Sequence, residues 1–140
     1  MTKFESIAQE FRGADAPLRL ELLIDYAQRL PELPEKYRAL RDAGLNLVHE
    51  CQAPVFLAVE VEDGKVRLFG DVPREAPTAR GFTSIMIDAF DGADAADVEE
   101  APLDALHELG LDSLLGMQRT RGLSAIYRRI KDEAGRKTAV

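Results

Sequence analysis

The spacing of the hydrophobic residues changes twice along this chain. Up to residue 30 they recur every three to four positions, between residues 55 and 69 they alternate, and after residue 78 the longer spacing returns. A period of 3.6 is typical of helices that bury one face, and a period of 2 is typical of strands. The order of helices, antiparallel strands and helices predicts an α+β fold.

Two helices are predicted before the strands. Residues 1–13 are predicted to form an N-terminal helix, because their apolar residues recur at helical spacing. The pattern leaves open whether this helix lies at the periphery of the domain. The second helix starts after Asp15, a favourable N-cap, and ends before Pro31, because the residue preceding a proline is pushed out of the α region. Residues 31–44 are predicted to be a loop with one helical turn at most.

The strands are predicted to form a three-stranded antiparallel meander packed against helices on one face. In residues 55–62 apolar side chains alternate, with Val55, Leu57, Val59 and Val61 on one face. The Asp63-Gly64 pair that follows is typical of a two-residue type I′ turn, and residues 65–70 form the return strand. Residues 45–49 supply the third strand.

Helices are predicted again in the rest of the chain. Thr78 is the expected N-cap of a helix that ends near Phe90. Two short helices follow at 95–100 and 103–109, the second closed by Gly110. The last helix is predicted to bury Leu123, Ile126, Tyr127 and Ile130 and to direct Arg128, Arg129 and Lys131 outward.

Composition limits the class of protein. The chain has 140 residues, 46% of them apolar, which is enough for a single domain covering residues 1–140 with one core. Its one cysteine excludes an intrachain disulfide and a zinc or iron–sulfur site built from several thiolates, so no metal site of this kind is expected. The net charge of −7 disfavours a nucleic-acid partner. With no apolar segment long enough for a membrane span or a secretion signal, we expect a cytoplasmic protein.

The charges are distributed unevenly. Residues 91–113 hold eight acidic and no Lys or Arg side chains, whereas residues 114–140 hold seven basic and two acidic ones. Neutralisation within the molecule is the simpler interpretation of this contrast, and a surface for docking a partner is the alternative.

Cys51 is the first candidate for chemistry, since it lies between the predicted strands 45–49 and 55–62. A free cysteine is often a small buried hydrophobic residue, but loops held by a rigid sheet commonly carry reactive groups. His49 lies two residues away and is a weak candidate for a general base; an exposed histidine at a strand end is the simpler interpretation. His107 stands among acidic residues and is expected to be solvated.

Four segments carry a resemblance to a known family. They are QRLPELPEKYR at 28–38, Cys51-Gln52 ahead of a strand, Leu68-Phe69-Gly70-Asp71, and Arg119-Thr120-Arg121-Gly122-Leu123. Their order and spacing, from about Leu18 to Ile130, resemble those of the SufE family of cysteine desulfuration proteins, the sulfur acceptors of iron–sulfur cluster assembly.

This resemblance implies a one-domain α+β fold of the SufE/NifU-like type, in which a single cysteine accepts sulfane sulfur from a cysteine desulfurase. The partner is expected to be a SufS-like enzyme that carries the PLP, so the chain needs no cofactor of its own. Iron–sulfur scaffold proteins are expected downstream. In this family the cysteine loop is sheltered in the free protein and swings out on docking. The resemblance also implies a stoichiometric carrier rather than an independent turnover enzyme, present as a monomer or weak homodimer.

The match carries the acceptor cysteine of the family's Gly-Cys-Gln-Ser motif onto Cys51, with Gln52 also matching. The family's Gly-Asp pair falls on Gly70 and Asp71, and the Arg, Gly and Leu of its last motif fall on Arg119, Gly122 and Leu123. The chain departs from the family at Glu50, Ala53, Phe56 and Arg121, which replace glycine, serine, tryptophan and an amide. A carboxylate at Glu50 should oppose ionisation of the neighbouring thiol.

Sulfur transfer requires a thiolate, which nearby cations favour. Arg119 is therefore the first candidate for stabilising the Cys51 thiolate, and Arg121 is the second. Asp71 could hydrogen-bond to the cysteine loop, although a structural role in the turn after the strand is preferred.

Three alternative functions remain beside the sulfur carrier. The strongest is an allosteric module that activates the desulfurase without covalent transfer. A cluster scaffold is disfavoured because the related scaffolds use three cysteines. A cysteine hydrolase that uses Cys51 with His49 or His107 lacks any local signature.

Overall fold

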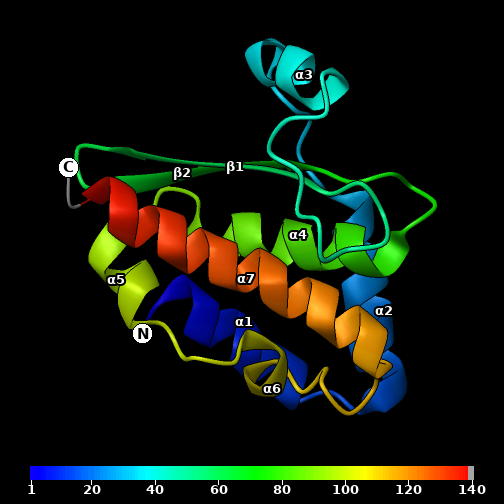
Figure 1. Cartoon of the computed structure of the whole chain (residues 1–140). Helices are drawn as coiled ribbons and strands as arrows, with labels where there is room; N and C mark the ends of the chain where they lie inside the picture. Colours follow the sequence, from blue (N-terminus) through cyan, green and yellow to red (C-terminus); the bar gives the residue numbers. More distant parts are fainter. Residues whose placement is uncertain (139–140) are drawn as a thin grey trace.

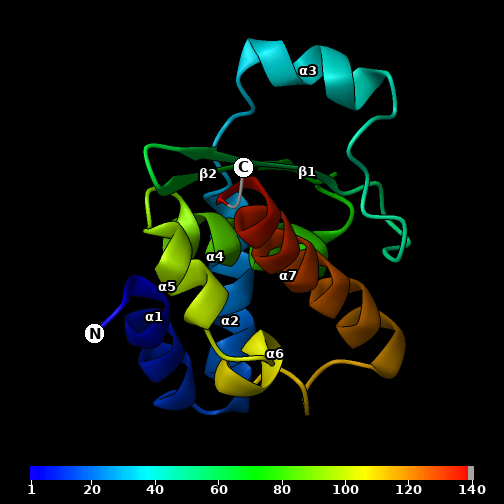
Figure 2. The ribbon, with the colours of Figure 1, turned by 60° about the vertical axis from the view of Figure 1, so that its left-hand side comes forward.

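A hairpin of two strands separates the helices into two unequal layers in the computed structural model, which describes residues 1–138 (Figures 1 and 2). Strands β1 (Phe56–Glu62) and β2 (Lys65–Asp71) pair antiparallel. One face of the hairpin is covered by α4 (Pro77–Phe90) and α7 (Met117–Thr138), with four further helices behind or beside them: α1 (Lys3–Arg12), α2 (Ala16–Gln28), α5 (Ala95–Glu100) and α6 (Ala105–Glu108). Helix α3 (Glu35–Asp42) lies alone over the other face.

The hairpin confirms the predicted turn. Asp63 has a φ of 52° and Gly64 a φ of 77°, the two positive values that a type I′ turn requires. The turn fixes the register of the strands, which places Val61 opposite Val66 and Leu57 opposite Gly70. The α+β prediction and the positions of these two strands are therefore correct.

The predicted third strand at 45–49 is wrong, since the sheet of the described residues has two strands. Leu47 forms one isolated bridge with Phe56, and the chain then turns away. Asn46 has a φ of 57°, which interrupts extended backbone immediately before that bridge. The residues from 49 onward turn back instead of continuing the pairing.

Residues 31–44 also differ from the prediction, because they contain the eight-residue helix α3. Its one buried residue, Tyr37, stacks on Phe69 with ring centroids 4.5 Å apart and packs with Phe56 in a small second core. Helices therefore cover both faces of the hairpin rather than one. A helix this short depends on such tertiary contacts more than on its own propensity.

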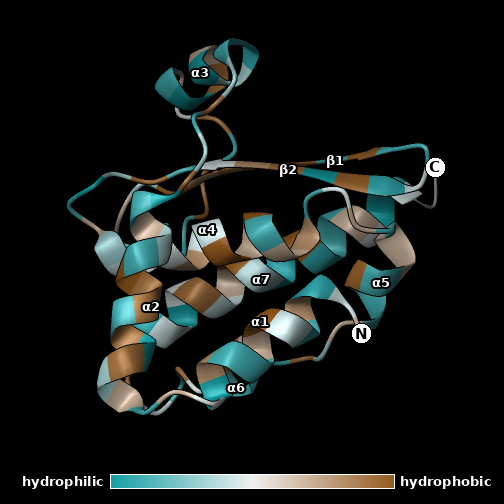
Figure 3. Cartoon of the chain, turned by 180° about the vertical axis from the view of Figure 1, so that it is seen from behind, coloured by the Kyte–Doolittle hydropathy of each residue, from teal (hydrophilic) through white to brown (hydrophobic). Residues whose placement is uncertain are grey.

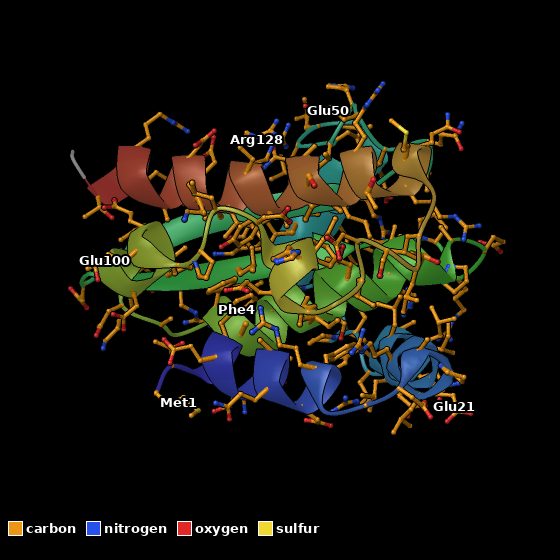
Figure 4. All side chains as sticks on the ribbon, turned by 90° about the horizontal axis from the view of Figure 1, so that it is seen from below. Met1, Phe4, Glu21, Glu50, Glu100 and Arg128 are labelled. Atoms are coloured by element: carbon orange, nitrogen blue, oxygen red, sulfur yellow. The ribbon has the colours of Figure 1, made fainter. Side chains whose placement is uncertain are left out.

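The two N-terminal helices follow the predicted pattern. The Asp15 carboxylate accepts a hydrogen bond from the Leu18 amide at 3.0 Å and caps α2 as expected. Helix α1 joins the main core through four buried side chains, one of which is Phe4 (Figure 4). The Phe4 ring stacks against Phe90 with ring centroids 5.5 Å apart. Figure 3 shows the long helices as alternating hydrophilic and hydrophobic bands, the arrangement expected where one face is buried.

Helix α4 begins one residue before the predicted cap. Its N-cap is Ala76, with no side-chain cap hydrogen bond, and Pro77 occupies the first turn, so the assignment of Thr78 as N-cap is wrong. Proline suits this position because the amide it lacks would have no partner in the helix. The first turn of α4 thus leaves backbone N–H groups free of side-chain caps.

The last helix buries the four apolar side chains predicted for it. Arg128 is exposed as predicted, but Arg129 and Lys131 are partly buried and donate hydrogen bonds to the carbonyls of Leu47 and Ala101. Their assignment as outward-facing side chains is therefore wrong. No helix in residues 1–138, α7 included, combines the length and the apolar composition that a membrane span needs.

The acidic segment 91–113 is partly neutralised within the molecule. Asp91 pairs with Arg67, Asp94 with Lys65, and Glu108 with Arg12. Nδ1 of His107 lies 3.0 Å from Oδ2 of Asp112, and this hydrogen bond raises the pKa of the histidine, which is solvated as expected. The neutralising groups come largely from the first half of the chain, not from residues 114–140.

Candidate functional site

Cys51 lies at the tip of the loop that joins α3 to β1. Figure 2 shows the course of this loop from α3 to β1. Backbone hydrogen bonds close the base of this loop, from Val48 N to Val55 O at 2.9 Å and from Leu57 N to Asn46 O at 3.0 Å. Within the tip, Cys51 N donates to Val48 O at 3.2 Å. The cysteine is thus carried on a tight turn whose base is fixed to the start of β1.

The thiol rests against the first turns of α7. Sγ of Cys51 donates to the carbonyl of Gly122 at 3.3 Å. A Cβ atom on Gly122 would lie 3.1 Å from this sulfur and 3.4 Å from the Cα of Cys51. The glycine therefore permits a close approach of loop and helix that a side chain would crowd.

A pocket of about 360 Å³ opens beside the half-buried sulfur. Three segments line it: the loop residues 51–53, residues 75–79 at the start of α4, and residues 118, 119, 122 and 123 of α7. The first turn of α4 contributes the positive end of a helix dipole to this wall. The pocket offers space next to Cys51 for an additional sulfur atom.

The environment of Cys51 disfavours the thiolate. Burial is the larger cause and the neighbouring Glu50 carboxylate the second, and together they raise the pKa of Cys51 from 9.0 to about 11. The effect of Glu50 has the direction expected from the sequence. The contribution of burial depends on the packing of the loop against α7, which the sequence pattern does not contain.

The two candidate arginines differ in their relation to the thiol. Arg119 lines the pocket together with Cys51, and its side chain remains exposed. Arg121 is exposed and lies outside the lining that the described residues form. The structure thus brings the first candidate, but not the second, to the pocket that contains the sulfur.

The two remaining candidates lie apart from this pocket. His49 is exposed on the loop, ahead of the cysteine. Oδ2 of Asp71 accepts a hydrogen bond from Arg41 at 2.7 Å, and Oδ1 lies 4.0 Å from Nη1 of Arg80. Asp71 therefore connects the end of β2 with α3 and α4. In residues 1–138 no group of three His, Cys, Asp or Glu side chains is placed to hold a metal ion.

Sequence reasoning missed two parts of the site. Arg129 donates from Nη2 to Leu47 O at 2.9 Å, which connects α7 with the cysteine loop. Residues 75–79 form one wall of the pocket. A helix start near residue 78 is predicted from the sequence, but no local signal places it beside Cys51, and no pattern marks Arg129.

The fold and the site define a class of protein: a small α+β domain that carries one half-buried thiol on a loop beside a pocket. The chain belongs to the SufE family, because the family model described as an Fe-S metabolism associated domain matches residues 5–134. This confirms the family resemblance noted in the sequence.

Relatives and a solved structure agree with this assignment. The chain is 40% identical over 126 residues to an uncharacterized SufE-like protein of Mycobacterium tuberculosis, covering 89% of this chain and 86% of that protein. It is 32% identical over 126 residues to the sulfur acceptor protein CsdE of Escherichia coli, covering 85% and 82%. A solution structure of a hypothetical protein from Thermus thermophilus matches with a TM-score of 0.82 and 31% identity over 100% of both chains.

Proposed function

We propose that this protein is a sulfur acceptor, which takes sulfane sulfur from a PLP-dependent cysteine desulfurase as a persulfide on Cys51. It then delivers the sulfur for iron–sulfur cluster assembly and stimulates the desulfurase. The observation that carries the proposal is the position of the chain's one cysteine, whose half-buried sulfur faces a pocket large enough for a second sulfur atom. The similarity to a relative named as a sulfur acceptor supports it.

The transfer is an exchange between a thiolate and a persulfide. The Cys51 thiolate attacks the outer sulfur of the donor persulfide, a new S–S bond forms on Cys51, and the S–S bond of the donor breaks. The donor cysteine leaves as a thiolate and takes up a proton, while the proton of the Cys51 thiol passes to solvent. The outer sulfur keeps its oxidation state, so the step needs no external oxidant or reductant.

The free protein holds Cys51 in a form that reacts slowly. With a pKa of about 11 the thiol is almost entirely protonated at neutral pH, and its proton is directed at the Gly122 carbonyl. Docking of the donor must therefore move the loop or supply positive charge near the sulfur. The persulfide would then be held beside Arg119 and the first turn of α4.

Arg119 is expected to favour the thiolate through its charge. The variant Arg119→Ala should label more slowly at Cys51 with iodoacetamide at neutral pH. A neighbouring cation lowers the pKa of a thiol, so its loss reduces the fraction of thiolate. The measurement is the labelling rate against pH by intact mass. Arg121→Ala provides the matched comparison and tests the second candidate: a loss of rate in that variant alone would transfer the role to Arg121. Unchanged profiles in both would refute a role for either arginine.

The covalent step can be tested directly. Incubated with a cysteine desulfurase, PLP and cysteine, the wild-type protein should gain the mass of one sulfur atom on Cys51, and treatment with a reducing thiol should remove it. Cys51→Ser should show no adduct. Absence of the adduct in wild type, with the desulfurase turning over, would contradict the carrier function.

The raised thiol pKa favours one alternative, an allosteric module that stimulates the desulfurase without accepting sulfur. The same experiment separates the two functions. If Cys51→Ser stimulates the desulfurase as strongly as wild type does, and wild type carries no added sulfur, the allosteric function is the correct one. If stimulation disappears with the cysteine, the covalent acceptor accounts for it.

A further inference from the structure

The cysteine loop is fixed to the rest of the molecule in two different ways. At its base, backbone hydrogen bonds and the Leu47–Phe56 bridge continue the pairing of β1, which fixes residues 46–48 to the hairpin but not to α7. At its tip, the loop contacts α7 through the bond from Cys51 to Gly122. A thiol is a weak hydrogen-bond donor, so this contact alone holds the tip of the loop to α7 only weakly.

The second side-chain connection to α7 comes from Arg129. Its Nη2 donates to the Leu47 carbonyl at 2.9 Å, across 82 positions of sequence, and its side chain is partly buried between helix and loop. A hydrogen bond from a charged group is about twice as strong as a neutral one. Arg129 therefore provides the strongest polar contact between α7 and this loop among the described residues.

A cavity of about 210 Å³ lies along the same contact. Glu50 borders it from the loop, and Ala125, Arg128, Arg129, Asp132 and Glu133 border it from α7. Figure 4 shows Glu50 and Arg128 at the same edge of the molecule. The loop is thus not densely packed against α7 on this side, so its position depends on few contacts.

We infer that Arg129 is a positioning residue that sets how readily the Cys51 loop opens from α7. While its guanidinium holds the Leu47 carbonyl, the loop keeps Cys51 Sγ against Gly122, where the sulfur is shielded. Without this bond the base of the loop is held to β1 alone, and the tip is held to α7 only by the weak thiol contact. The tip then separates from α7 more readily, and solvent or a docking partner can reach the thiol. The role in sulfur transfer rests on the proposed function, whereas the effect on thiol exposure does not.

Arg129→Met, which keeps much of the apolar stem, should accelerate iodoacetamide labelling of Cys51 by about tenfold, because a charged hydrogen bond is lost from the closed state. It should also shift the labelling profile to lower pH, since the opened thiol is less buried. Arg129→Lys should restore much of the wild-type profile. Arg136→Met is the matched control: it removes the same charge from an exposed side chain of the same helix that does not border this cavity, and it should label as wild type does.

Equal rates for Arg129→Met and wild type would overturn the inference, as would equal acceleration by Arg136→Met, which would assign the effect to net charge. Labelling that rises steeply with low urea would show global unfolding instead and would also count against a local role. Should Arg129→Met fail to fold, hydrogen exchange of residues 46–54 in Arg129→Gln decides, since faster exchange confined to this loop is required. A failed sulfur adduct with altered labelling would reject the proposed function and leave this inference standing.

Discussion

In the folded protein at neutral pH, Cys51 is expected to react with iodoacetamide about a hundredfold more slowly than an ordinary cysteine, because its pKa is raised from 9.0 to about 11. The thiolate is the reactive species, and a rise of this size in the pKa reduces its fraction by that factor at any pH well below both values. The rate should then increase about tenfold per pH unit up to the limit of stability. Intact mass against time, from neutral pH upward, measures it.

The urea-unfolded chain is the natural reference for this measurement, since it presents the same thiol without the burial. Glu50→Gln provides the second comparison. Burial is the larger cause of the shift, so this variant should lower the apparent pKa yet leave it above that of the unfolded chain. If the labelling rate of the folded protein levels off at the same pH as that of the unfolded chain, the thiol is not shielded. The result would then favour a loop that is already open in the free protein.

A thiol that reacts slowly in the free protein fits a sulfur carrier better than a hydrolase. A hydrolase needs a nucleophile that is ionised and oriented before the substrate arrives. A carrier benefits from a thiol that resists oxidants until its donor docks, because oxidation also proceeds through the thiolate. The Glu50 carboxylate strengthens this resting state through its charge.

The local parts of the fold could be predicted from the sequence. The Asp63-Gly64 turn and the alternation around it depend on residues adjacent in the chain, and the amphipathic helices depend on their own periodicity. Helix α3 could not be predicted in this way. It exists because Tyr37 packs on Phe69 and Phe56, which belong to strands far beyond it along the chain.

The candidate site shows the same division. Cys51 is identifiable because it is the one thiol of the chain and matches the family's motif. Its contact with Gly122 joins residues 71 positions apart, and no periodicity encodes such a pairing. The helical pattern assigns Arg129 to the solvent side next to the exposed Arg128, but the cysteine loop covers that side of the helix. The missing information is tertiary, not local.

Gly81→Ala should lower the free energy of unfolding by about 2 kcal/mol, because an added Cβ overpacks the contact between α2 and α4. That Cβ would lie 2.3 Å from the backbone oxygen of Leu23 and 2.9 Å from its Cδ1. The obstructing oxygen belongs to a helix backbone and cannot rotate away, so the two helices must separate. The gain in helix propensity, about 1 kcal/mol for replacing glycine by alanine, offsets only part of this cost.

Gly135→Ala makes the same change in the interior of α7 and should have the opposite sign. Its nearest neighbour would be the carboxylate of Glu99 at 3.0 Å, the flexible end of a side chain that can move aside. The propensity gain then dominates, and stability should rise by about 0.5 to 1 kcal/mol. Urea denaturation of both variants measures the pair. Equal stabilisation by both substitutions would mean that α2 and α4 do not approach this closely at Gly81. The packing that places the start of α4 beside Cys51 would then be looser than described.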